Sequence, residues 1–396
     1  MKKILLLVIT AALAASLSSC SFLGPIPNTV TGTETESKEE TVTDEITFDL
    51  TELHIDLTGD HMPYYETCVR YGWSLLDKEQ KQMYKSVLEA ALLYEDSVSL
   101  PDDGTAKFIY ECVFFDTPEL FYLDETPQIK DGTVYFRYAF ERDYAAELAE
   151  ELDAAYGAFI SSEGIDGDTS GYETLTSLYE YIINRTKYAE EADADYEADV
   201  YNERVYRSVC AAGPLVDGRS ICIGYARATQ YLGLRCGMQV FTVKGAGSSG
   251  RHYYSLVLLD GAYYYVDTTW GDPVGEDRSI DYLTYNYFCI TTEELLRSHE
   301  IRTDIPLPVC TEEKYNYFVY NGLYSNDPEE IAGLIFDAYE AGLEKAQVKT
   351  DRDKLEKILK KIQPAIKKVF KDNGVTDVQF GVAMSDGPSL ISVYFR

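Results

Sequence analysis

The segment RHYYSLVLLDGAYYYVDTTWGDP, residues 251–273, constrains the fold more than any other part of this 396-residue chain. Two runs rich in tyrosine, valine and leucine flank Asp260 and Gly261. An Asp-Gly pair between two such runs is a strong signal for a two-residue β-hairpin turn. We therefore predict an antiparallel hairpin in which Leu259 pairs with Ala262.

The register of that hairpin brings a histidine and a carboxylate together. Counting outward from the turn pairs Tyr254 with Asp267, and His252 lies two residues before Tyr254 on the same face. His252 and Asp267 are then diagonal neighbours, roughly 7–8 Å apart at the backbone and within side-chain reach. A turn longer or shorter by one residue would place them on opposite faces. Taken singly, each has a simpler explanation, His252 as a polar strand-edge residue and Asp267 as a turn cap.

A cysteine opens a second informative stretch, GRSICIGYARA, residues 218–228. Gly218 and Ser220 are suited to a turn and an N-cap, and a helix is expected to run from there until Gly237 stops it. Cys222 then lies in the first turn, where backbone N–H groups and the helix dipole stabilise a thiolate. An inert core cysteine and one half of a disulfide are the alternatives to a nucleophile. A nucleophilic cysteine needs a base such as His252, oriented by a third group such as Asp267.

The odd number of cysteines predicts a free thiol in a chain that we expect to be exported. Without Cys20, which the N-terminus sets apart as explained below, seven remain: Cys68, Cys112, Cys210, Cys222, Cys236, Cys289 and Cys310. An odd number means that at least one is unpaired or paired between molecules. Cys210 and Cys236 are either core residues or partners in a disulfide. The sequence has no Cys-x-x-Cys pair, so we predict no zinc site.

The first 46 residues predict the compartment. Two lysines precede the apolar run ILLLVITAALAASL, which is too short to span a membrane and is typical of a secretion signal. LSSC then resembles the bacterial lipobox, which implies cleavage after Ser19 and lipidation of Cys20; an ordinary signal peptide is the alternative. We expect a lipoprotein signal peptide over residues 1–19 and a disordered tether over 20–46. The predicted location is extracytoplasmic, anchored to the cell membrane.

The composition excludes one class of partner. The chain has 35 lysines and arginines against 67 aspartates and glutamates, a formal charge of −32. A field of this sign repels nucleic acid, so no nucleic-acid partner is expected.

The motifs together resemble the transglutaminase-like superfamily, in its bacterial branch of exported and lipid-anchored members. The matching residues are Gly218, Cys222, Gly224, Tyr225, Ala226, His252, Val266, Asp267, Thr269, Trp270, Asp272 and Pro273. The match covers about residues 172–310. The resemblance implies an α+β fold with a papain-like core, in which a helix carrying the cysteine packs on an antiparallel sheet carrying the histidine and aspartate. It implies Cys222, His252 and Asp267 as the catalytic triad and thioester chemistry on an amide carbonyl.

One departure from the family concerns the wall beside the base. Relatives often have His-Ala-Trp-Asn where this chain has HYYS, residues 252–255, which changes the expected substrate pocket. The Cys222 N–H is one expected oxyanion donor. Tyr225, Trp270 and Tyr254 are candidates for a second donor or for the pocket. No metal and no cofactor are required by this chemistry.

The rest of the chain divides into three expected regions. They are a mostly helical N-terminal region with short strands over 47–160, a transglutaminase-like catalytic domain over 161–318 and a small α/β unit over 319–396. Helices are predicted over 78–96, 143–160, 172–187 and 351–374, the last kinked at Pro364; strands over 132–140, 377–384 and 389–396; and an acidic loop over 190–203.

The sequence therefore predicts a lipid-anchored cysteine hydrolase or acyltransferase. Its substrate would be an amide bond in a peptide or protein, with cell-wall peptide as one source, and its membrane contact would be the N-terminal lipid. The alternative is a non-catalytic surface-binding or scaffold lipoprotein with the same fold. A further alternative is a lipoprotein in which Cys222 forms a disulfide. The sequence does not predict the oligomeric state.

Overall fold

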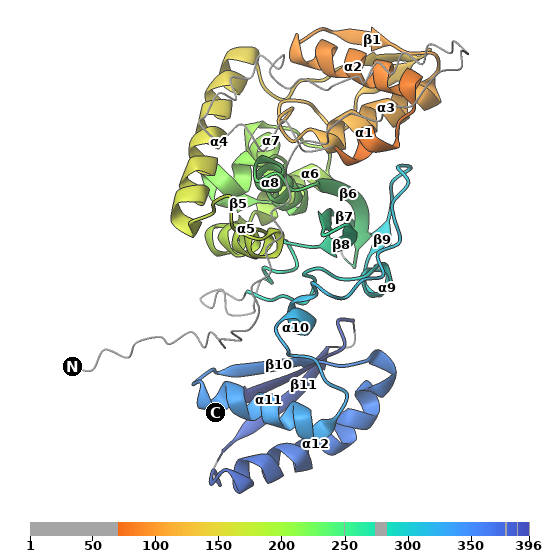
Figure 1. The fold of residues 1–396 in the computed structure, drawn as a ribbon. Coiled ribbons are helices and arrows are strands. Elements are labelled where there is room, and N and C mark those ends of the chain that lie inside the picture. The colour runs from red at the N-terminus through yellow and green to blue at the C-terminus, as the bar shows by residue number, and fades with distance from the viewer. Residues whose placement is uncertain (1–69, 249, 274–282, 377, 386, 396) are drawn as a thin grey trace, which may run out of the picture. The chain divides into compact units, whose positions relative to one another are not determined.

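The computed structural model describes residues 70–248, 250–273, 283–376, 378–385 and 387–395 (Figure 1). All of them belong to one compact unit, Phe48–Arg396. The predicted signal peptide, the predicted tether with Cys20, and Cys68 lie outside the described residues. The domain boundaries predicted at 160 and 318 stay predictions.

The first described part consists of helices and a small antiparallel sheet. Its elements are α1 (Tyr71–Leu75), α2 (Lys78–Leu92), β1 (Ser97–Ser99), α3 (Asp103–Asp116), β2 (Gln128–Lys130) and β3 (Thr133–Tyr135), with the strands in the order β1-β3-β2. Local sequence sets these starts: Asp77 and Gln80 form a capping box at α2, and Asp102 caps α3 through Thr105 N–H. The strand predicted over 132–140 is shorter in the structure, because only Thr133–Tyr135 pairs with both neighbouring strands.

The next part is helical. It comprises α4 (Arg142–Glu163), α5 (Gly171–Arg185), β4 (Lys187–Tyr188), α6 (Glu190–Glu197), α7 (Glu203–Ser208), a π-helix (Gly213–Asp217) and β5 (Arg219–Ser220), with β4 and β5 forming a short parallel pair. The prediction of an acidic loop over 190–203 is wrong for residues 190–197. Acidic residues favour the first turn of a helix, and α6 buries Ala192 and Tyr196 against the core.

A buried helix and a four-stranded antiparallel sheet follow. They are α8 (Cys222–Arg235), β6 (Val240–Gly247), β7 (Gly250–Leu259), β8 (Ala262–Val266) and β9 (Glu300–Ile301), with α9 (Thr292–Leu295) between the last two strands. The strand order is β8-β7-β6-β9. Helix α8 packs against β6 and β7 on one side and against α5 on another (Figure 1). All fourteen of its residues are buried, so α8 is an interior helix.

The hairpin has the predicted register. Leu259 pairs with Ala262, and Ser255 pairs with Val266. Asp260 and Gly261 have φ angles of 48° and 81°, the two positive values that a type I′ turn requires.

The last part has its own hydrophobic cluster. Its elements are α10 (Tyr317–Tyr320), α11 (Pro328–Glu340), β10 (Lys345–Lys349), α12 (Arg352–Asp372), β11 (Phe380–Ser385) and β12 (Leu390–Phe395), and the sheet order is β10-β12-β11. Pro364 lies inside α12, as predicted. The cluster is formed by apolar residues of α11, α12 and the three strands.

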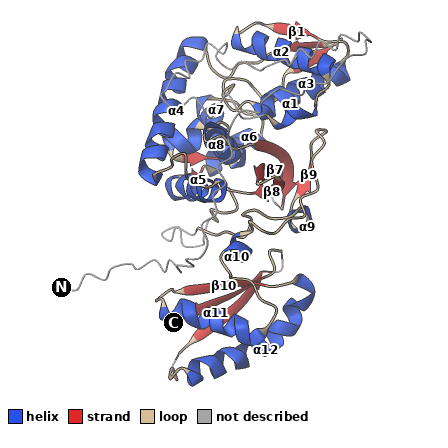
Figure 2. Ribbon diagram, in the orientation of Figure 1, coloured by secondary structure: helices blue, strands red, loops and turns tan. Residues whose placement is uncertain are grey.

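The described chain combines helices with three antiparallel sheets and one short parallel pair, so the fold is α+β, as predicted (Figure 2). Among the described helices, none combines the length and the apolar character that crossing a membrane demands.

Candidate active site

Cys222 is the first residue of α8 and is nearly buried, with 3% of its surface exposed. Its thiol is free. The predicted N-cap at Ser220 is wrong: Ile221 occupies that position and gives no side-chain cap. The Ser220 hydroxyl instead donates to the Ser208 carbonyl at 2.7 Å, because Ser220 is buried in the short strand β5.

Gly224 allows the start of α8 to approach the preceding backbone. A Cβ at this position would lie within 3.0 Å of the Ser208 carbonyl oxygen and of Ser220 Oγ, closer than real Cβ atoms come. Glycine is therefore required here for close packing, since its backbone angle is an ordinary helical one. The packing fixes where the first turn of α8, with Cys222, lies.

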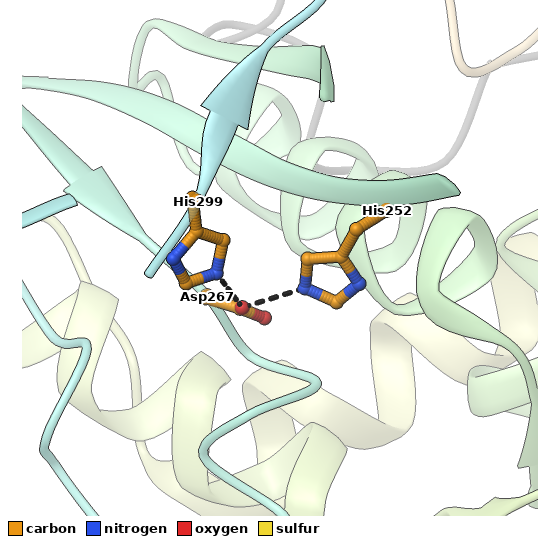
Figure 3. A group of neighbouring side chains, drawn as sticks. All are labelled: His252, Asp267 and His299. Carbon is orange, nitrogen blue, oxygen red and sulfur yellow. Dashed lines mark hydrogen bonds and ion pairs between the residues drawn. The ribbon is translucent and has the colours of Figure 1, made fainter. Parts of the chain in front are cut away.

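His252 and Asp267 form a buried hydrogen-bonded pair. His252 Nε2 lies 2.7 Å from Asp267 Oδ2, and the two residues are 4% and 1% exposed. His252 comes from β7 and Asp267 directly follows β8, and the histidine ring points at the carboxylate (Figure 3). The other carboxylate oxygen, Oδ1, accepts the Trp270 backbone N–H at 3.0 Å. The hairpin register thus produces the contact that the sequence predicted.

His252 and Asp267 each shift the pKa of the other. Burial lowers the pKa of His252, but the charge of Asp267, the hydrogen bond between the two and a hydrogen bond with the Cys222 side chain outweigh it, and the pKa is raised. Burial raises the pKa of Asp267, yet His252 and His299 together hold it below its ordinary value. Asp267 engages Nε2, so Nδ1 is the ring atom that remains available. His252 and Asp267 are thus in contact, and Cys222 lies close enough to raise the pKa of His252.

His299, which the sequence reasoning did not assign, is the second histidine on Asp267. It directly precedes β9, its side chain is fully buried, and its Nε2 lies 3.0 Å from Asp267 Oδ2. His299 Nδ1 lies 2.9 Å from the Ser298 hydroxyl. No local pattern predicts this contact. The only available signal was that the chain has just four histidines, of which this is one.

The donor atoms of His252, Asp267 and His299 are close enough together to suggest a metal site, within 4.8 Å of one another. However, both Nε2 atoms lie at hydrogen-bonding distance from the same oxygen. Each ring nitrogen then presents an N–H to the carboxylate, and a protonated nitrogen has no lone pair for a metal. We interpret the cluster as a hydrogen-bonded one.

A cleft of about 540 Å³ opens beside His252. Its lining residues are Tyr188, Glu190, Asp193, Glu197, Arg251, His252, Thr269, Trp270, Asp272, Pro273, Thr284, Asn286 and Tyr287. Four carboxylates and one arginine are among them, and Arg251 is paired with Glu197 at 3.3 Å. The described wall of the cleft is therefore acidic.

The three further candidates from the sequence have different environments. Trp270 lines the cleft, with its ring centre 5.4 Å from that of His252. The Tyr225 hydroxyl donates to Asp272 Oδ2 at 2.6 Å, so its proton is already used in that hydrogen bond. The Tyr254 hydroxyl donates to the Glu300 carbonyl at 3.1 Å, which ties β7 to β9.

Tyr188 is a residue beside the nucleophile that the sequence reasoning missed. Burial, the Cys222 thiol and Asp193 all raise the pKa of its hydroxyl, and a backbone hydrogen bond from Cys222 lowers it. Tyr188 therefore lies near Cys222, and it lines the cleft beside His252.

The other cysteines of the described chain are free thiols. Cys210 and Cys236 form no disulfide, which answers the alternative left open by their spacing. Burial raises the thiol pKa of Cys210 and Cys310 to about 11 and that of Cys236 to about 12, and it also raises those of Cys112 and Cys289. These five thiols are therefore poor nucleophiles at neutral pH.

Comparisons with known proteins find a structural similarity but no matching family model. The chain matches no protein-family model. A comparison with curated proteins also found no match. Among solved structures, one similar chain is a crystal structure of a TGase, with a TM-score of 0.26 and 15% sequence identity. The superposition covers 49% of this chain and 48% of that one, so the chain spans about half the length of its structural neighbour.

Proposed function

We propose that the chain is a cysteine hydrolase or acyltransferase that acts on amide bonds of peptides or proteins. The observation that carries the proposal is the buried contact between His252 and Asp267 beside the free thiol of Cys222. A nucleophile, a base and an orienting carboxylate, with a cleft beside the base, are the parts that acyl transfer requires. The papain-like core and the transglutaminase-like family belong to this proposal.

The chemistry follows from the positions of the three side chains. His252 takes the proton of the Cys222 thiol, and the thiolate attacks the amide carbonyl carbon. The Cys222 N–H stabilises the oxygen that becomes negative. As the C–N bond breaks, His252 returns the proton to the leaving amine, and a thioester remains on Cys222. Water or a second amine then attacks the thioester, His252 accepts its proton, and the thiol is regenerated.

Asp267 makes both proton transfers possible. Its carboxylate accepts a hydrogen bond from His252 Nε2, which leaves Nδ1 available for Cys222. The negative charge stabilises the imidazolium that forms when the thiol loses its proton. Hydrolysis is the default outcome when water reaches the thioester, and transfer requires that an amine displaces it.

The proposal includes the location and anchor predicted from the N-terminus. Cys20 would carry the lipid and the protein would act outside the cytoplasm, on surface proteins or wall peptides. Metabolic labelling with an alkyne fatty acid tests the anchor, since a Cys20→Ala variant should lose the label. Label that persists in Cys20→Ala would contradict lipidation at this residue.

The test of the chemistry is the alkylation rate of Cys222 against pH, measured by peptide mass spectrometry with iodoacetamide. The expected result is a reactive plateau well below the free-thiol pKa of about 8.5, which His252→Ala abolishes. Cys210 and Cys236 serve as internal controls, because burial raises their pKa to about 11 and about 12. A Cys222 that reacts no faster than these two would favour the non-catalytic scaffold instead.

A fluorescent primary amine then separates the two reactions. Incubation with a glutamine-containing protein and the amine yields labelled protein if the chain is an acyltransferase, and new free termini or ammonia if it is a hydrolase. Cys222→Ala is the matched control for both products. Equal product formation by this variant would exclude Cys222 as the nucleophile.

A further inference from the structure

The second histidine on Asp267 has a role in the proposed reaction. We infer that His299 is a positioning residue: its Nε2–H holds the Asp267 carboxylate in place and keeps it ionised for His252. The inference rests on the proposed function, because its purpose is to support the base of that reaction. A positioning role differs from a purely structural role because loss of His299 would then change how the site responds to pH.

The direction of the hydrogen bonds follows from the acceptor. An ionised carboxylate can only accept, and Asp267 Oδ2 is 2.7 Å from His252 Nε2 and 3.0 Å from His299 Nε2. His299 must therefore carry a hydrogen on Nε2. In the neutral ring Nδ1 is then an acceptor, and the Ser298 hydroxyl 2.9 Å away supplies the matching donor. Ser298 thus favours the tautomer that serves Asp267.

Aromatic side chains enclose the His299 ring. Its side chain is fully buried, and its ring centre lies 4.2 Å from that of Trp270, 5.2 Å from Tyr287 and 5.3 Å from Tyr254. Trp270 can approach this closely because Gly247 has no side chain: a Cβ there would lie 2.8 Å from the indole ring. A polar ring enclosed by aromatic side chains is stable only if its N–H has a partner, and Asp267 is that partner.

Asp267 needs this second donor because it is buried. Oδ1 has the Trp270 backbone N–H, and Oδ2 has the two imidazoles. If His252 were the only donor to Oδ2, each proton transfer between Cys222 and His252 would alter the only side-chain hydrogen bond that stabilises the Asp267 carboxylate. With His299 present, one donor stays fixed throughout the reaction.

Among the described residues, the other titratable groups facing Asp267 are hydroxyls that stay neutral. They are Tyr179 from α5, Tyr254 from β7 and Tyr287 from the segment before α9, and burial raises the pKa of each. The pH response of the carboxylate therefore depends on the two histidines and on Cys222.

The experiment compares the pH profile of Cys222 alkylation in the full chain, its His299→Phe variant and its His299→Gln variant, each measured with and without EDTA. Phenylalanine fills the space without an N–H, whereas the glutamine amide nitrogen can replace Nε2 as a donor. A charge-assisted hydrogen bond lost from a buried carboxylate raises its pKa by about one to two units. We expect the acid limb of the His299→Phe profile to move to higher pH, because Asp267 then takes up a proton more readily and no longer supports His252, and we expect His299→Gln to restore it.

The outcomes separate the inference from the proposed function. An acid limb of His299→Phe that coincides with the wild type overturns the positioning role, whatever happens to its thermal stability. A wild type without any reactive plateau overturns the proposed function, and the inference with it. A plateau that EDTA removes from the wild type would mean that a metal, not hydrogen bonds, joins the cluster.

A measurement on the wild type covers the case in which His299→Phe does not fold. In a spectrum of ¹⁵N-histidine-labelled chain, the signal absent from His299→Gln belongs to His299. We expect that signal to show Nε2 protonated and Nδ1 unprotonated across the pH range in which Cys222 reacts. A ring protonated only at Nδ1 would overturn the inference.

Discussion

The position of Cys222 depends on a neighbour that has no side chain. Gly224 lies two residues into α8, where the helix touches the Ser208 carbonyl. The backbone on both sides is fixed, so an added methyl group must push the helix start away. The Cys222 thiol would move with it.

We predict that Gly224→Ala lowers the alkylation rate of Cys222 by at least tenfold and destabilises the fold by about 1–3 kcal/mol. Gly157→Ala is the matched control, since Gly157 lies in α4 with nothing within 4 Å of its added Cβ. That change should leave reactivity intact and raise stability by about 0.5–1 kcal/mol. Urea unfolding and the alkylation assay measure both, and equal effects of the two substitutions would contradict the packing argument.

The pair of His252 and Asp267 predicts how stability depends on pH. Folding raises the pKa of His252 from 6.5 to about 10, so its contribution is complete below 6.5 and is lost as the pH rises through about 10. Folding lowers the pKa of Asp267 from 3.8, so its contribution is present above 3.8 and is lost as the pH falls below it. The pair therefore stabilises the fold most between these two unfolded-state values.

Asp267→Asn tests this prediction, because asparagine retains the shape and removes the charge. The free energy of unfolding of the wild type should exceed that of the variant most near pH 5–6, and the difference should shrink toward pH 10. Asp337→Asn is the control, since Asp337 lies exposed on α11, away from the pair. A difference that stays constant from pH 5 to pH 10 would show that the charge of the pair does not contribute.

At the scale of elements, local contacts were predictable and distant ones were not. The Asp-Gly turn determines which residues of β7 and β8 face each other, so the sequence predicted that His252 and Asp267 meet. His299 joins them from a segment 32 residues beyond Asp267, and only the packing of β9 on β6 brings it there. The Ser220 cap failed for the same reason, because a long-range partner, Ser208, takes the hydroxyl.

Gly245, in β6, is another glycine whose position leaves no room for a side chain. A Cβ at Gly245 would lie within 3.0 Å of the Glu300 carbonyl oxygen and of the Tyr254 ring. Both belong to strands that flank β6, so a larger residue separates β9 from the sheet. His299, which directly precedes β9, would then move away from Asp267.

We predict that Gly245→Ala destabilises the fold by about 1–3 kcal/mol and shifts the acid limb of Cys222 reactivity in the same direction as His299→Phe. Gly381→Ala, in β11, is the strand control because nothing lies within 4 Å of its added Cβ. It should be neutral or slightly stabilising. If Gly245→Ala destabilises the chain without moving the acid limb, β9 does not control the site.

At the scale of the whole molecule, the negative charge leads to a prediction about the substrate. The chain has a formal charge of −32, and the described cleft wall has Glu190, Asp193 and Asp272 in addition to the ion-paired Glu197. Such a field attracts cationic peptides and repels acidic ones, and dissolved salt screens it.

We predict that peptides with a lysine or arginine near the reacting amide have a higher kcat/KM than acidic ones, by about tenfold at low salt. The preference should fall as sodium chloride rises from about 0.05 to 0.5 M. Glu190→Gln should weaken the preference, and Glu203→Gln, at the start of α7 and outside the cleft lining, is the charge-matched control. A preference that does not change with salt would contradict electrostatic selection.

The complete burial of α8 has a consequence for the lifetime of the site. A helix enclosed on every side cannot exchange its amide hydrogens with solvent through local fraying, so its amides should exchange only when the whole core opens. Cys222 begins that helix. We therefore expect Cys222 to lie in one of the slowest-exchanging segments of the described chain, and heat should abolish its reactivity and the native structure at a single temperature.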